Sequence, residues 1–278
     1  MYPIGTLEWA LELHKHEIVP GLFYSDSEKE NHYMTTNEWK QFFDVTNRVI
    51  ITMNARHFRD KKFIEWAVKY KPKYIEIQNG ATAKEEDRIG KHSGDLTIIK
   101  LLKSFAKLYI KDIVFYGKQF SSEVKNLMDA VNVKNFRAAG SNTTHSLEES
   151  IRYAKENFNL PIIASGGIYT KQDHTRALDL GADCVLLGSV FAMSTESNLS
   201  NEAKHLVLTK QGKDIKQLGP DHRNGLSLGS VDNNDDNNLT KNLNNLSQHG
   251  NNGVVYVGKG IDSITAIQPI KEIVKIFN

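Results

Sequence analysis

Two short glycine turns follow neighbouring apolar runs of the sequence. Ser165-Gly166-Gly167 comes directly after Pro161–Ala164, and Gly188-Ser189 comes directly after Asp183–Leu187. Bare backbone N–H groups and a hydroxyl can approach the oxygens of a phosphate where no Cβ stands in the way. In a (β/α)₈ barrel, the loops after the last two strands commonly hold a phosphate. The pattern therefore predicts that both turns face one phosphate site, although tight turning alone would also explain the glycines.

A second group of polar residues lies at the end of the predicted strand Val133–Ala138. The loop Gly140-Ser141-Asn142-Thr143-Thr144-His145 combines glycine backbone, three hydroxyls, an amide and an imidazole. Capping of a helix that begins at Leu147 would explain one or two of these residues but not all six. Asn79-Gly80 follows another predicted strand, Tyr74–Gln78. We expect both strand ends to contribute to the site.

Strand and helix patterns alternate along residues 1–191, which argues for parallel strands joined by right-handed crossovers. The predicted fold is an α/β TIM-type (β/α)₈ barrel. Since only seven strands are predicted, either the first barrel strand is missing or a C-terminal segment replaces it. The predicted helices include Asp95–Leu108 and Ser121–Val131. The predicted strands are Ile18–Phe23, Val49–Thr52, Tyr74–Gln78, Asp112–Tyr116, Val133–Ala138, Pro161–Ala164 and Asp183–Leu187.

The strand and helix pattern ends after Met193, and we expect one domain, 1–278, with three parts. Residues 1–191 are the barrel core, 192–262 an excursion from it, and 263–278 a closing helix. Within the excursion, Gly229–Gly253 is dominated by Asn, Asp and Gly, so it has little to bury and is predicted to be a mobile flap. Val254–Val257 is predicted to be a strand, and Ile267–Phe277 to be the closing helix.

Composition limits the possible partners and the compartment. The 278 residues carry 35 Lys and Arg against 33 Asp and Glu, a net charge of +2, which does not favour a nucleic acid or an anionic membrane as partner. The only cysteine, Cys184, excludes an intrachain disulfide and is expected to be packed inside a strand. The histidines lack metal-ligand spacing. With no secretory signal or membrane-length apolar run, a cytoplasmic protein is expected.

The chain resembles the IMP dehydrogenase/GMP reductase family, and GMP reductase in particular. Ile163–Ser197 resembles the family's phosphate region, and Tyr74–Gly80 resembles its I-D-x-A-N-G strand end. Further segments match in the family's order: Gly5–Glu8, His32–Phe42, Lys210–Leu218 and Gly250–Gly258. The resemblance implies a purine nucleoside 5′-monophosphate bound at the C-terminal face of the barrel, NADPH or NAD as cofactor, and a homo-oligomer.

The resemblance also implies roles for single residues. Ser141, Ser165, Gly166, Gly167, Gly188 and Ser189 would bind the nucleotide and its phosphate, and Asn79, Gly80, Gly140 and Thr143 would lie on the cofactor side. Thr144, Glu196 and Asn142 would take part in catalysis. Asn142 stands where the family has its nucleophilic cysteine, and an amide cannot form that covalent adduct. Ser165 stands where the family has an aspartate.

These observations predict a divergent purine-nucleotide oxidoreductase, and they leave two alternatives open. One is a catalytically inactive, nucleotide-binding scaffold that kept the barrel and lost the chemistry. The other is an FMN-dependent enzyme of the nitronate monooxygenase type, which Ser165-Gly166-Gly167 fits better than it fits the nucleotide enzymes.

Overall fold

The computed structural model describes residues 5–24, 34–78, 88–92, 94–111, 120–140, 143–218, 223–228 and 253–278. The chain divides into two compact units. The N-terminal unit comprises Gly5–Val133 and Ile151–Ile163, and the C-terminal unit comprises mainly Lys134–Ser150 and Ala164–Asn278. The division predicted from the sequence, into a barrel core at 1–191, an excursion at 192–262 and a closing helix at 263–278, stays a prediction.

Seven strands lie in sequence order in one sheet, and the neighbours from β1 to β5 pair in parallel. The TIM-type α/β class predicted from the sequence is therefore confirmed. The strands are β1 (Gly21–Phe23), β2 (Ile50–Met53), β3 (Tyr74–Ile77), β4 (Lys107–Ile110), β5 (Ala130–Val133), β6 (Ile162–Ser165) and β7 (Cys184–Leu186).

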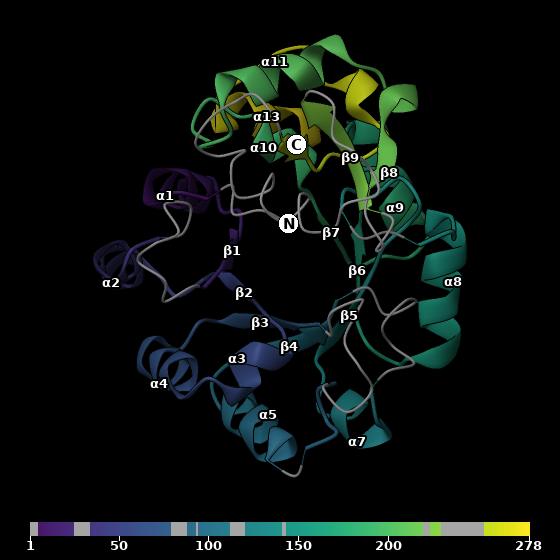
Figure 1. The fold of residues 1–278 in the computed structure, drawn as a ribbon. Coiled ribbons are helices and arrows are strands. Elements are labelled where there is room, and N and C mark those ends of the chain that lie inside the picture. The colour runs from purple at the N-terminus through teal and green to yellow at the C-terminus, as the bar shows by residue number, and fades with distance from the viewer. Residues whose placement is uncertain are drawn as a thin grey trace. The chain divides into compact units, whose positions relative to one another are not determined.

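Helices alternate with these strands. In Figure 1, α1, α2, α4 and α5 flank strands β1–β4. The helices are α1 (Leu7–Lys15), α2 (Thr36–Val45), α3 (Ala55–Arg59), α4 (Lys61–Tyr70), α5 (Asp95–Lys103), α7 (Ser122–Lys125), α8 (Leu147–Asn157), α9 (Lys171–Asp179), α10 (Ser189–Ala192), α11 (Asn201–Thr209) and α13 (Ile270–Phe277). A second, antiparallel sheet has the order β10 (Gly253–Val255), β9 (Arg223–Leu228) and β8 (Lys216–Leu218). Short 3₁₀ turns lie at Gly212–Asp214 and Ile261–Ser263.

Aromatic side chains pack α2 against α4 in the N-terminal unit. Trp39 of α2 meets Trp66 of α4 edge to face, with ring centroids 5.0 Å apart and planes at 76°. Phe43 stacks on Tyr70 at 4.8 Å. Such pairs contribute about 0.5–1.5 kcal/mol each beyond the apolar area that they bury. Thr35 starts α2 with a capping box to Glu38, which fixes where this aromatic face begins.

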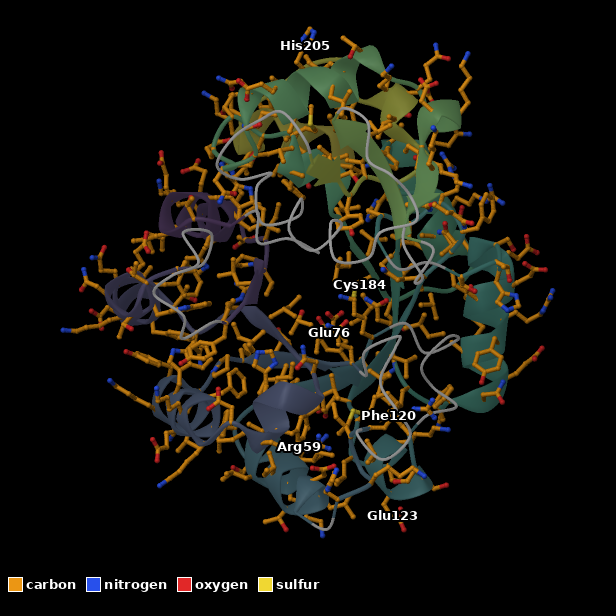
Figure 2. The ribbon with its side chains drawn as sticks, in the orientation of Figure 1. Arg59, Glu76, Phe120, Glu123, Cys184 and His205 are labelled. Carbon is orange, nitrogen blue, oxygen red and sulfur yellow. The ribbon has the colours of Figure 1, made fainter. Side chains whose placement is uncertain are left out.

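The two faces of the N-terminal sheet differ in chemistry. Side chains such as Ile75 and Ile77 are fully buried on one face. On the other face the Thr52 hydroxyl donates to the Glu76 carboxylate at 2.8 Å, and the Lys111 ammonium lies 3.3 Å from the same oxygen. Glu76 is labelled in Figure 2. The Lys111 and Glu76 side chains are only 12% and 5% exposed, so the buried Glu76 carboxylate depends on Lys111 for charge compensation.

Two boundaries predicted from the sequence are wrong. The predicted helix Asp95–Leu108 ends at Lys103, because the next apolar residues form β4 in register with β3. The predicted helix Ser121–Val131 shrinks to α7, and β5 begins at Ala130 instead of Val133. Short apolar runs fit a helix and a buried strand equally well, and only pairing with a neighbouring strand decides between them. The strand predicted at Asp112–Tyr116 lies outside the described residues.

The C-terminal part agrees better with the sequence. Strand β10 and helix α13 fall within or close to the predicted segments Val254–Val257 and Ile267–Phe277. The flap predicted at Gly229–Gly253 lies outside the described residues, apart from Gly253 at the start of β10. Within the described part of the chain, no helix is long and apolar enough to cross a membrane.

Lys111→Met should lower the free energy of unfolding by about 3 kcal/mol, because it leaves the Glu76 charge buried without its ammonium partner. Urea unfolding measures this loss. Lys61→Met is the matched control, since Lys61 and Glu65 form an ion pair whose side chains are 90% and 64% exposed. That control should change the free energy of unfolding by less than about 1 kcal/mol. Equal, small losses in both variants would contradict the assignment of a buried ion pair.

Asp129 ties β4 to β5 and should make stability depend on pH. Its carboxylate lies 2.7 Å from the Lys103 ammonium and accepts the Leu108 N–H at 2.9 Å. Burial raises the pKa of this carboxyl, but the bonds to Lys103 and Leu108 outweigh burial and leave the pKa below its ordinary value. The unfolded chain then binds the proton more readily than the folded one.

The stability that Asp129 contributes should therefore be fully present above about pH 5 and decline as the pH falls below about 4. The measurement is the difference in free energy of unfolding between wild type and Asp129→Asn, taken across this range. A difference that stays constant down to pH 3 would contradict the lowered pKa.

Candidate functional site

The turn after β6 can be made only by glycine. Gly166 and Gly167 have φ of +85° and +69°, in the left-handed region that other residues rarely adopt. A Cβ on Gly166 would collide with the side chain of Ala138, and one on Gly167 would lie 2.8 Å from the Cβ of Arg137. The turn thus lies directly against the loop that follows β5, and both belong to the C-terminal unit.

The second predicted turn leads into α10. Gly188 is the residue before this helix, and Ser189 is its first residue. The Ser189 hydroxyl oxygen accepts a hydrogen bond from the Tyr169 hydroxyl at 3.1 Å and one from the Gly258 N–H at 3.3 Å. Tyr169 and Ser189 are only 4% and 8% exposed. The hydroxyl of Ser189 is therefore held in place from two sides.

Backbone donors remain available at both turns. Across the residues that the structure describes, the N–H groups of Gly167, Ile168, Ser189 and Val190 donate no hydrogen bond. Ile168, Ser189 and Val190 are buried, and a buried N–H group without an acceptor is unfavourable. An anion placed at these groups would remove that penalty, as at other glycine turns and helix starts. We call Gly167, Ile168, Ser189 and Val190 the amide cradle.

Arg137 lies between the turn after β6 and residues 258–260. The Arg137 side chain contacts Gly167, and the Arg137 backbone carbonyl accepts a hydrogen bond from the Lys259 N–H at 2.9 Å. A Cβ on Gly260 would lie 3.0 Å from Nη2 of the guanidinium, and one on Gly258 would lie 2.7 Å from the Tyr169 hydroxyl. Residues 258–260 are thus packed against Arg137 and Tyr169, with the Ser189 hydroxyl next to Gly258.

Three cationic side chains belong to this region. Arg137 is half-buried, and its charge acts on the Tyr169 hydroxyl. Lys134 is buried at the end of β5, where its ammonium donates to the Ala139 carbonyl at 3.4 Å. The Lys259 ammonium lies 6.0 Å from the ring centroid of Phe136. Three positive charges on the loop after β5 and on residues 258–260 favour an anionic ligand in this region.

Two asparagines hold the loop that carries Arg137. The Asn135 amide donates to the Gly166 carbonyl at 2.6 Å, and its oxygen accepts the Arg137 N–H at 2.8 Å. Asn224 of β9 donates to the carbonyls of Phe136 and Ala138, at 3.0 and 2.8 Å. Its backbone also pairs with Gly140 in both directions. The loop is therefore bound to the turn after β6 and to the second sheet.

The other residues predicted for the site are placed less completely. Ser141, Asn142, Asn79 and Gly80 lie outside the described residues. Gly140 has φ of +64° and pairs with β9. Ser165 ends β6 and is buried. Thr143 is buried and its hydroxyl accepts the His145 N–H at 3.3 Å, whereas Thr144 is exposed. The roles assigned to these residues stay predictions.

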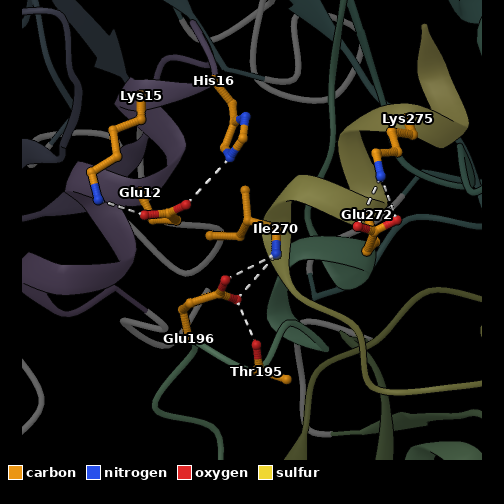
Figure 3. A network of polar contacts seen from close by, with 8 residues as sticks. All are labelled: Glu12, Lys15, His16, Thr195, Glu196, Ile270, Glu272 and Lys275. Carbon is orange, nitrogen blue, oxygen red and sulfur yellow. Dashed lines mark hydrogen bonds and ion pairs between the residues drawn. The ribbon is translucent and has the colours of Figure 1, made fainter.

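Glu196 has a clear structural partner. Figure 3 shows both of its carboxylate oxygens at the N–H of Ile270, each at 3.1 Å, and the Thr195 hydroxyl donating at 3.0 Å. Ile270 is the first residue of α13, so a carboxylate here stabilises the start of that helix. Its predicted part in proton transfer gains no support from this position, since the carboxylate is bound to a helix end.

The expectation that Cys184 is packed inside a strand is wrong. Cys184 begins β7, is exposed, and is labelled in Figure 2. Desolvation of its sulfur and the charge of Asp183 raise the pKa of the thiol, which disfavours the thiolate that a nucleophile needs. No group of three or more His, Cys, Asp or Glu within the described residues could bind a metal ion.

Comparison with known proteins identifies the family. The family model of nitronate monooxygenase matches residues 22–277. Among solved structures, a point mutant of FabK from Thermotoga maritima is similar with a TM-score of 0.77 and 17% identity, covering 100% of this chain and 89% of that one. Nitroalkane oxidase from Streptomyces ansochromogenes is similar with a TM-score of 0.71 and 13% identity, covering 99% and 91%. At these identities the two structures support the fold alone.

The resemblance to GMP reductase is weaker. GMP reductase of Buchnera aphidicola is 27% identical over 218 residues, which is 70% of this chain and 56% of that protein. The interpretation as an IMP dehydrogenase/GMP reductase-type enzyme is wrong, and the match over residues 22–277 overturns it. The error has a physical cause: a phosphate cradle of glycine backbone has the same sequence pattern whichever phosphate it holds. The chain belongs to the nitronate monooxygenase family, a family of oxidoreductases.

Proposed function

We propose that this chain is an FMN-dependent oxidoreductase that oxidises alkyl nitronates, and that the amide cradle binds the FMN phosphate. The observation that carries the proposal is the set of undonated N–H groups at Gly167, Ile168, Ser189 and Val190. The family supplies the reaction class. A nitroalkane oxidase shares the fold, although at 13% identity.

The residues present fit a phosphate ester. A phosphate presents several acceptor oxygens, and the cradle offers four backbone N–H groups together with the Ser189 hydroxyl. Because Gly166 and Gly167 have no Cβ, the loop after β5 can lie against their backbone. Arg137 adds a positive charge beside the turn, which favours a doubly charged anion over a neutral ligand.

The protein's part in the reaction is binding and orientation. FMN, when bound, supplies the redox chemistry for nitronate oxidation. Holding the phosphate at the ends of β6 and β7 would fix one end of the cofactor against rigid elements of the fold. A nitronate is an anion, so the charges of Lys134, Arg137 and Lys259 would favour its approach over that of the neutral nitroalkane. NADPH or NAD was expected as cofactor from the resemblance to GMP reductase. Since that resemblance is overturned, it no longer supports either cofactor.

FMN binding tests the proposal. The purified protein, incubated with FMN and freed of excess ligand, should retain the visible absorption of the flavin and consume oxygen when an alkyl nitronate is added. Gly167→Ala should weaken FMN binding about tenfold or more, since a Cβ there is strained by positive φ and lies against Arg137. Flavin fluorescence titration measures the affinity.

Gly94→Ala is the matched control, because Gly94 has an ordinary φ of −78° and a Cβ there meets nothing within 4 Å. Its FMN affinity should equal that of the wild type. A wild-type protein that binds no FMN would overturn the proposal. If the protein binds FMN but consumes no oxygen when an alkyl nitronate is added, FMN remains the proposed cofactor and the proposed nitronate substrate is overturned.

The position of the Arg137 loop depends on Asn224. Asn224→Ala should lower the free energy of unfolding by about 2–4 kcal/mol, because the Ala138 carbonyl in a buried bond and the Phe136 carbonyl in a part-buried bond would both lose their donor. Asn157→Ala is the control, since the exposed Asn157 amide also donates to one carbonyl, that of Tyr153 at 2.8 Å. Urea unfolding measures the free energy of unfolding of both variants. Amide hydrogen exchange within Phe136–Gly140 should become faster in Asn224→Ala and stay unchanged in Asn157→Ala. Equal effects in both variants would contradict the anchoring role.

A further inference from the structure

The Ser189 hydroxyl has only one hydrogen-bonding capacity left for a ligand. A serine hydroxyl can donate one hydrogen bond and accept two. The Tyr169 hydroxyl donates to the Ser189 oxygen at 3.1 Å, and the Gly258 N–H donates to it at 3.3 Å. Both acceptor positions are thus used. Within the described residues no acceptor receives the Ser189 proton, so this proton is left to donate to a ligand.

The direction of the Tyr169–Ser189 bond follows from the surroundings of Tyr169. The backbone N–H groups of Gly258 and Gly260 and the charge of Arg137 favour negative charge on the Tyr169 oxygen, and the Ser189 oxygen lies 3.1 Å from it. The proton of Tyr169 then has the Ser189 oxygen as its partner. Burial raises the pKa of the Tyr169 hydroxyl, so the group keeps its proton and stays a donor at neutral pH and in mild alkali. The packing of residues 258–260 against the ring keeps this geometry in place.

We propose that Tyr169 is a positioning residue that directs the Ser189 proton toward the phosphate of the ligand, which makes the site select phosphorylated over unphosphorylated ligands. The inference rests on the proposed binding of FMN at the cradle. Tyr169 need not touch the ligand, because it acts through the Ser189 hydroxyl. Without the Tyr169 proton, the Ser189 hydroxyl could rotate and donate elsewhere, and its bond to phosphate would weaken.

The test compares FMN with riboflavin, which has the same ring system and no phosphate. Dissociation constants of both flavins are measured by fluorescence titration for wild type, Tyr169→Phe, Ser189→Ala and the double variant. Ser189→Ala should weaken FMN binding about tenfold and Tyr169→Phe about fivefold. The double variant should lose no more than Ser189→Ala alone, because Tyr169 acts through that hydroxyl. Riboflavin binding should stay within about twofold of wild type in all of them.

Tyr153→Phe is the matched control, since it removes a tyrosine hydroxyl from α8, where the described residues offer that hydroxyl no hydrogen bond. Its affinity for both flavins should equal that of the wild type. The selective loss for FMN is the readout that a purely structural role of Tyr169 would not produce. An equal loss for FMN and riboflavin in Tyr169→Phe, or no loss for either, would overturn the positioning role.

The same measurement separates this inference from the proposed function. A wild-type protein that binds FMN no better than riboflavin would overturn the positioning role and leave flavin binding intact. A wild-type protein that binds neither flavin would overturn the proposed function, and the inference with it.

Discussion

The contact between the glycine turn after β6 and the loop after β5 is the constraint on which the rest of the site depends. Gly166 and Gly167 lie so close to Ala138 and Arg137 that no side chain fits between them. Asn135 joins the two segments by its bond to the Gly166 carbonyl. Held in this way, the turn presents its N–H groups without acceptors, and the side-chain stem of Arg137 lies against Gly167. The proposed anion site is therefore a consequence of backbone packing.

The second sheet extends the same constraint. Asn224 binds the carbonyls of the Arg137 loop, and residues 258–260 pack against Arg137 and Tyr169. Segments separated by many residues along the chain thus meet at one loop of the C-terminal unit. The N-terminal unit contributes parallel strands whose buried polar face carries the Glu76–Lys111 ion pair. Buried charges of this kind are sensitive to loss of either partner.

The sequence predicted the parts of this structure that local pattern determines. Alternating strands and helices indicated the barrel class, and the glycines after two apolar runs indicated the turns at Gly166 and Ser189. The predicted C-terminal end of α5 and the predicted start of β5 were wrong, because a neighbouring strand decides whether a short apolar segment forms a helix or a strand. The roles of Tyr169, Asn135 and Asn224 could not be predicted, since their partners are distant in sequence. Beyond the glycines, the positive charge of Arg137 is a local feature in the sequence that indicates an anion site.

The family was misread for a related reason: glycine backbone binds phosphate without side-chain chemistry that would tell one phosphate ligand from another. A crystal structure of the protein with FMN is the most direct test of the account. In that structure, phosphate oxygens should lie within hydrogen-bond distance, about 2.7–3.2 Å, of the N–H groups of Gly167 and Ser189. An FMN phosphate bound elsewhere, with these N–H groups still lacking an acceptor, would contradict it.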